Sequence, residues 1–117
     1  MKNFKKIELY LLFICFLIVI LYVPPSYSLT SRENLFNNAL NLSSRGDINL
    51  ALKQWNNYLE LFPDDAAALS NRGNIKLIIG DPEGAINDQD RAINLDPDEV
   101  DPYINRGIAE ELSLIHI

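Results

Sequence analysis

The side chains that could perform chemistry are concentrated in one acidic cluster near the end of the chain. Asp96, Asp98, Glu99 and Asp101 follow one another at short intervals, and closely spaced carboxylates can coordinate calcium. The cluster lacks the glycine at the sixth loop position and the distal glutamate that a calcium-binding loop uses. Helix capping on the two sides of a turn explains the spacing better. We therefore predict no metal site.

No other group of residues has the composition of an active site. Cys15 is the single cysteine, which permits neither an intrachain disulfide nor a cysteine-based metal site. His116 is the single histidine. The sequence contains no glycine-rich phosphate-binding loop and no nucleophile elbow. We predict a protein that is not an enzyme, holds no cofactor and has no small-molecule substrate.

The chain repeats a pattern of residues with a period of 34. The tripeptide Asn71–Gly73 recurs as Asn105–Gly107, and Pro63 recurs as Pro97. A fixed period in this range is typical of a solenoid of stacked helical hairpins. We therefore predict an all-α fold, an α-solenoid of antiparallel helical hairpins. Its repeats cover residues 32–65 and 66–99, and a third repeat starts over residues 100–111.

Capping signals mark the helix ends within each repeat. In the second repeat Asp65 precedes the first helix, Gly80 ends it, and Asp81-Pro82 begins the second helix. Gly46 and Asp47 stand at the corresponding places in the first repeat. Three aromatic residues have spacings that favour core packing, with an aromatic binding stripe as the alternative: Trp55, Tyr58 and Tyr103.

The repeats resemble the tetratricopeptide repeat. At the eighth position, where a small residue lets two helices approach, the chain has Ala39, Gly73 and Gly107, and at the twentieth it has Ala51 and Ala85. The resemblance covers residues 32–111. It implies that Gly73 and Ala85 face each other where the two helices of the second repeat cross.

Three residues depart from the pattern of that family. Gln89 stands where an aromatic residue is expected, and Arg72 and Arg106 replace the usual leucine. These departures concern the local packing of the helices and leave the resemblance intact.

The resemblance also implies a concave groove, because in this family the first helix of each repeat lines a surface that receives extended peptides or partner helices. The ladder Asn37, Asn71 and Asn105 could bond a ligand backbone or, alternatively, the neighbouring helices. A subfamily that grips terminal carboxylates uses basic residues where this chain has Phe36, Asp101 and Asn105, which argues against such a ligand. We predict that the groove consists of Asn37, Leu40, Ser70, Asn71, Asn74, Asn105 and Ile108.

Residues 1–28 have the composition of an export signal or membrane anchor. Three lysines precede an uninterrupted apolar run of 15 residues, Leu9–Val23, and Pro24-Pro25 and a segment with small residues, Ser26–Ser28, follow it. As a helix the run spans roughly 22 Å, short of the ~30 Å hydrocarbon core, which favours a cleaved signal over an anchor through residues 9–23. Either places the repeats outside the cytoplasm, in a periplasm or thylakoid lumen or on a membrane facing it.

The charge balance restricts the partner. Of 16 acidic and 10 basic residues, one acid and three bases lie before Leu29. Residues 29–117 therefore carry a formal charge of −8, which argues against nucleic acid as the partner. We predict a scaffold for protein–protein interaction that binds a protein or peptide. The alternatives are the repeat module of a larger enzyme and a structural, membrane-anchored solenoid.

The last residues break the repeat. The period would place a glycine at position 114, where the chain has Leu114. We interpret residues 112–117 as a non-native tail, with a genuine short apolar terminus as the alternative.

Overall fold

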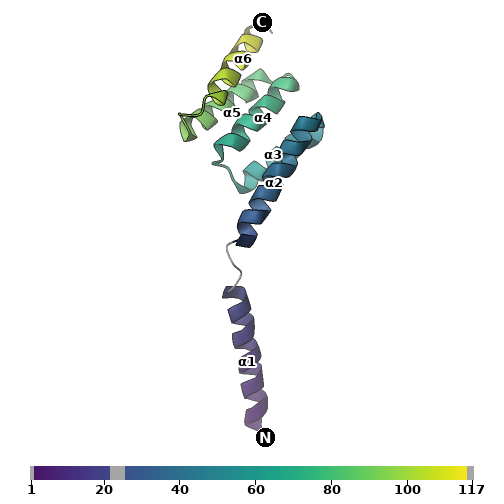
Figure 1. Ribbon diagram of the computed structural model, residues 1–117, viewed down its shortest axis with the longest axis vertical. Coiled ribbons are helices and arrows are strands. Elements are labelled where there is room, and N and C mark those ends of the chain that lie inside the picture. Colours follow the sequence, from purple (N-terminus) through teal and green to yellow (C-terminus); the bar gives the residue numbers. More distant parts are fainter. Residues whose placement is uncertain (1, 22–25, 116–117) are drawn as a thin grey trace. The chain divides into compact units, whose positions relative to one another are not determined.

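The computed structural model describes residues 2–21 and 26–115, and over these residues it contains six helices and no strand (Figure 1). The all-α prediction is therefore confirmed for the described part of the chain. The chain divides into two compact units, Met1–Ser31 and Arg32–Ile117. The helices are α1 (Lys2–Leu21), α2 (Ser26–Arg45), α3 (Ile48–Leu61), α4 (Ala66–Ile78), α5 (Pro82–Leu95) and α6 (Asp101–Ile115).

The first unit contains α1, which covers the predicted apolar run as far as Leu21. The rest of that run and the predicted break at Pro24-Pro25 lie outside the described residues. None of the helices in residues 2–21 and 26–115 is both long enough and apolar enough to cross a membrane. Helix α2 begins at Ser26, six residues before the predicted start of the first repeat at Arg32.

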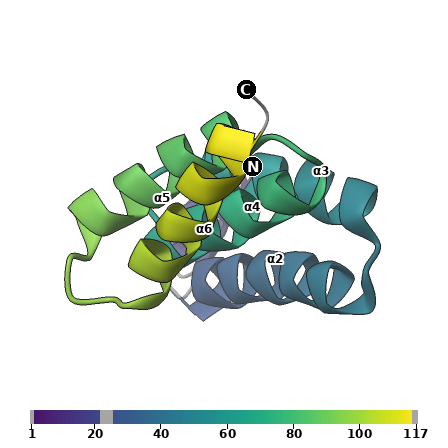
Figure 2. The same cartoon turned by 90° about the horizontal axis from the view of Figure 1, so that it is seen from above.

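In the second unit the helices form stacked antiparallel hairpins. Helix α4 packs on α5, α5 packs on α6, and α4 also contacts both α3 and α6 (Figure 2). The first helices of two successive repeats, α4 and α6, therefore lie side by side with α5 against both. This arrangement is consistent with an α-solenoid.

The predicted glycine caps are confirmed. Gly46 and Gly80 have φ angles of +79° and +83°, a left-handed conformation that glycine adopts without steric cost. The next helix then begins after an aspartate, but the two aspartates differ. Asp81 accepts a hydrogen bond from the Gly84 amide at 2.9 Å, as predicted. Asp47 is the N-cap residue of α3, as predicted, but its side chain accepts no capping hydrogen bond and lies 3.7 Å from Arg45.

Helix α6 continues through the predicted end of the third repeat. It runs to Ile115, so residues 112–115 extend the helix that begins at Asp101 rather than forming a separate segment. Residues 116 and 117 lie outside the described part.

The core of the second unit is built on an aromatic cluster. Trp55 and Tyr58 of α3 are 0% and 2% exposed, and the ring of Phe36 on α2 meets them edge-on, with ring centroids 5.0 and 5.5 Å away. Edge-on aromatic pairs add stabilisation beyond the area they bury. The core prediction is confirmed for Trp55 and Tyr58. It is wrong for Tyr103, which is 48% exposed and donates its hydroxyl hydrogen to the Pro97 carbonyl at 3.0 Å.

Asp65 joins three helices through one carboxylate. It caps α4 by accepting the Ala68 amide at 3.0 Å, as predicted, and it also accepts from the Tyr58 hydroxyl at 2.6 Å and from Arg32 at 2.8 Å. Burial alone would raise the pKa of the Asp65 carboxyl, but the hydrogen bonds from Tyr58, Ala68 and Arg32 together hold it below its usual value.

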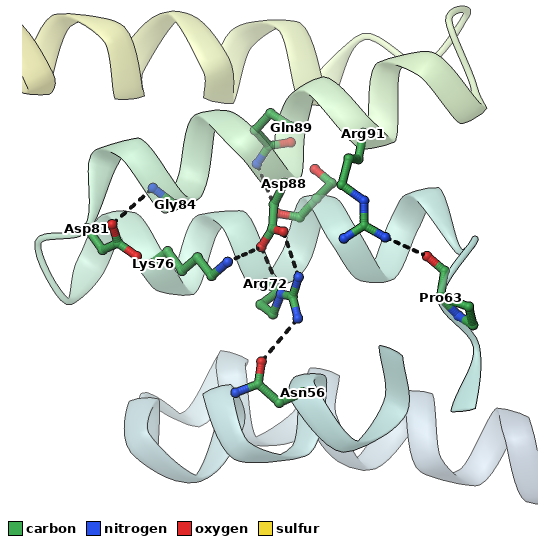
Figure 3. Close-up of polar contacts among 10 residues, drawn as sticks. Asn56, Pro63, Arg72, Lys76, Asp81, Gly84, Asp88, Gln89 and Arg91 are labelled. Atoms are coloured by element: carbon green, nitrogen blue, oxygen red, sulfur yellow. Dashed lines mark hydrogen bonds and ion pairs between the residues drawn. The ribbon is translucent and has the colours of Figure 1, made fainter. Parts of the chain in front are cut away.

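A second carboxylate, Asp88 of α5, is buried against two cations of α4 (Figure 3). Arg72 donates to both of its oxygens at 2.7 and 2.8 Å, and the Lys76 ammonium lies 2.9 Å away. Burial raises the pKa of the Asp88 carboxyl, yet the bonds from Arg72 and Lys76 together bring it below its usual value. Arg72 also donates to Asn56 of α3 at 3.1 Å. The arginine that replaces the family's leucine thus links three helices.

The close contact of α4 with α5 lies at Gly73. A Cβ atom added there would stand 2.5 Å from Gln89 Nε2 and 3.4 Å from the Ala85 carbonyl oxygen. The predicted contact between Gly73 and Ala85 is therefore confirmed. Gln89 is fully buried, and it fills the space beside Gly73 where an aromatic residue was expected.

We expect Gly73→Leu to destabilise the fold by about 1–3 kcal/mol, because large atoms would enter a site with no room for them. Gly107→Leu is the matched control. Gly107 has the same place in the next repeat, but an added Cβ there meets nothing within 4 Å, so the gain in helix propensity should leave stability unchanged or raise it by up to ~1 kcal/mol. Urea titration followed by circular dichroism measures both. Equal effects of the two substitutions would contradict the packing assignment.

We expect Asp88→Ala to destabilise the fold by roughly 3 kcal/mol, because it leaves two cations without their buried counter-ion. Asp90→Ala is the control, since Asp90 pairs with Arg106 while 47% exposed and should contribute under ~1 kcal/mol. The lowered pKa means that the Asp88 contribution is present above about pH 4 and is lost as the pH falls through the folded-state value. The stability gap between Asp88→Ala and the parent should therefore narrow below about pH 4. A gap that stays constant down to pH 2 would count against the ion cluster.

Candidate functional site

A groove of about 300 Å³ lies between α4 and α6. Its lining residues come from the first helices of two successive repeats and from the segment that connects α5 to α6. Seven of the ten lining residues have amide, hydroxyl or carboxylate side chains. We call it the α4–α6 groove, and its lining residues are Ala66, Ala67, Ser70, Asn71, Asn74, Asp96, Glu99, Asp101, Pro102 and Asn105.

The structure brings together four of the seven predicted groove residues. Ser70, Asn71 and Asn74 line the groove from α4, and Asn105 lines it from α6. The other three predicted residues do not line it. Asn37 and Leu40 lie exposed on α2, and Ile108 is exposed further along α6.

The asparagine ladder does not tie neighbouring helices together at its central member. Asn71 donates its amide hydrogen to the Ala67 carbonyl at 2.9 Å, within its own helix. The interpretation that Asn71 bonds an adjacent helix is therefore wrong. This bond uses one of the two amide hydrogens, so the Asn71 side chain keeps its oxygen and a second N–H for a ligand.

Asn74 lies about one helical turn along the same wall. The buried Gln89 donates through Nε2 to the Ser70 carbonyl at 3.0 Å and, with a longer bond, to Asn74 Oδ1 at 3.4 Å. The Asn74 side chain keeps its amide hydrogens and a second oxygen lone pair for a ligand. Asn71 and Asn74 thus each offer both a donor and an acceptor on one wall of the groove. Such groups complement the N–H and C=O of a peptide backbone.

Carboxylates form the negatively charged part of the groove. Asp96, Glu99 and Asp101 are all exposed, and no lysine or arginine is among the lining residues. Asp96 is the C-cap residue of α5, where its backbone amide donates to Ala92, and Asp101 lies in the first turn of α6. The described residues contain no group of three or more metal-ligating side chains placed to hold an ion. Because three carboxylates and no basic side chain line the groove, it can attract a cationic group electrostatically.

Sequence reasoning missed the contribution of Asp96 and Glu99 to the groove. We interpreted them as helix caps, and the 34-residue period gave no reason to expect a ligand at the turn between repeats. The unusual density of acids between Leu95 and Pro102 was the available signal. Only the packed structure shows that this turn lines the space between α4 and α6.

No protein-family model matches the chain. It is similar to tetratricopeptide repeat protein 36 of Mus musculus, with 32% identity over 73 residues, and to the protein of the same name of Danio rerio, with 38% identity over 50 residues. The chain resembles tetratricopeptide repeat proteins. The matches cover 62% and 43% of this chain but only 39% and 27% of the relatives, so the chain spans well under half the length of the relatives it matches. The names of these relatives confirm the resemblance to the tetratricopeptide repeat that we inferred from the sequence.

Proposed function

We propose that the protein is a non-catalytic scaffold that binds a protein partner through an extended segment lying in the α4–α6 groove. The observation that carries the proposal is that Asn71 and Asn74 line one wall about one turn apart and that each keeps both a hydrogen-bond donor and an acceptor. An extended peptide offers its N–H and C=O groups at regular intervals, and main-chain hydrogen bonds of this kind provide affinity that depends little on sequence.

The lining of the groove supports a peptide over a small organic ligand. Small-molecule pockets are lined mainly by apolar and aromatic side chains with a few polar groups. Here the apolar lining consists of Ala66, Ala67 and Pro102, and the rest is amide, hydroxyl or carboxylate. The net charge of −8 over residues 29–117 also disfavours a nucleic acid.

We expect the double variant Asn71→Ala/Asn74→Ala to weaken peptide binding by about tenfold, since it removes two hydrogen bonds worth ~0.5–1.5 kcal/mol each. The ligands would be peptides selected against the full chain from a random display library, with affinities measured by fluorescence anisotropy. Asn57→Ala is the control, because Asn57 is exposed on α3 and does not line the groove. Selected peptides that all bind the double variant as tightly as the parent would overturn the proposal.

We further propose that residues 1–28 direct export and that the repeats act outside the cytoplasm, in a periplasm or a thylakoid lumen. The basic head, the short apolar run and the small residues at Ser26 and Ser28 support this assignment.

We expect the mature chain to begin near Leu29 when the gene is expressed in a bacterial host, because the preceding small residues suit signal peptidase. N-terminal sequencing of the recovered protein checks this. An intact Met1 in the membrane fraction would contradict cleavage and favour the anchor, and an intact Met1 in the cytoplasm would contradict export altogether.

A further inference from the structure

We propose that the segment bound in the α4–α6 groove is basic, and that it places a lysine or arginine side chain among Asp96, Glu99 and Asp101. This inference rests on the proposed function and adds the chemical class of the partner. It follows from three features of the groove. Its carboxylates form no ion pair in the described structure, one of them lies at the C-terminus of a helix, and its wall offers hydrogen-bond acceptors.

The carboxylates of the groove differ from those that join the helices of the same unit. Asp65, Asp88 and Asp90 each lie within ion-pair distance of an arginine. Over residues 2–21 and 26–115 no such ion pair is formed by Asp96, Glu99 or Asp101. A groove lined by three carboxylates and by no basic side chain attracts a cation.

Asp96 lies at the end of α5. It is the C-cap residue of that helix, whose last turn has no basic residue. The C-terminus of a helix has a partial negative charge, so a cation is favourable beside Asp96 and its carboxylate is not. Asp101 differs, because it lies in the first turn of α6, where a carboxylate is favourable.

The buried amide of Gln89 shows the same polarity. Its Nε2 bonds Ser70 and Asn74, two residues that line the groove, whereas its Oε1 is buried without a hydrogen-bond partner in the described structure. A buried acceptor without a partner is costly unless a donor reaches it. The groove and its wall thus offer the Asn71 oxygen and three carboxylates as acceptors. Lysine and arginine side chains are donors only, which makes them the matching ligand groups.

Binding of a short, end-capped peptide with two lysines to the full chain in nonionic detergent tests the proposal by fluorescence anisotropy. Matched peptides carry norleucine or glutamate at the two lysine positions. We expect the lysine peptide to bind most tightly and to weaken as salt screens the charges. The double variant Asp96→Asn/Asp101→Asn should weaken the lysine peptide about five- to twentyfold, at two- to fivefold for each charge, and the norleucine peptide by less than about twofold.

Asp98→Asn is the matched control. It removes the same charge two residues from Asp96, but Asp98 is exposed and does not line the groove. It should leave the affinity for the lysine peptide within about twofold. An equal loss in Asp98→Asn and in the double variant would overturn the proposal, because the attraction would then come from the overall charge of the protein.

The remaining outcomes separate this inference from the proposed function. Norleucine and lysine peptides that bind equally, and that both weaken in Asn71→Ala/Asn74→Ala, would refute a basic ligand and leave the peptide groove standing. Binding that responds to none of the groove substitutions, or no binding of any peptide up to ~1 mM, would refute both.

Discussion

The close approach of α4 and α5 at Gly73 is the constraint on which the rest of the second unit depends. With no Cβ at this position, the side chain of Gln89 lies directly against the α4 backbone and reaches the Ser70 carbonyl. That bond brings the Gln89 amide to Asn74, whose oxygen accepts a second, longer bond from it. A packing requirement between two helices of one repeat therefore helps to position a side chain that lines the α4–α6 groove.

Charged side chains reinforce the stack in a pattern that follows the repeat. Arg72 of α4 bonds Asn56 of α3, and one repeat later Arg106 of α6 bonds Asp90 of α5. Both arginines bond a residue 16 positions earlier, on the second helix of the preceding repeat. An arginine can make such bonds while its aliphatic part packs on apolar neighbours. Arg72 and Arg106, which stand where the tetratricopeptide repeat usually has leucine, therefore make directional hydrogen bonds between repeats.

Carboxylates in this unit have two distinct environments. Those between packed helices, Asp65 and Asp88, are neutralised by hydrogen bonds and cations that lower the pKa of each carboxyl. Those on the turn before α6 face water and the groove. The first kind maintains the geometry of the helices, and the second kind leaves a negative potential at the surface. We propose that this potential selects the partner.

The all-α class, the 34-residue period and most of the helix ends could be predicted from the sequence, because these depend on local preferences. Gly80 suits the positive φ that commonly ends a helix, and Asp81-Pro82 favours a helix start. The helical spacing predicted correctly that Trp55 and Tyr58 enter the core, and the resemblance to the tetratricopeptide repeat implied correctly that Gly73 meets Ala85.

Which of the predicted groove residues lie together depends on how the helices pack. Ser70, Asn71, Asn74 and Asn105 converge because α4 and α6 lie side by side, whereas Asn37, Leu40 and Ile108 have equivalent helical positions but are not among the residues that line the α4–α6 groove. The roles of Gln89 and Asp88 were likewise out of reach, since each depends on which atoms of a neighbouring helix lie within about 3 Å of its polar end. A period specifies which residues share a helix face, but hydrogen bonds and charge pairs depend on distances that arise only when the faces are packed.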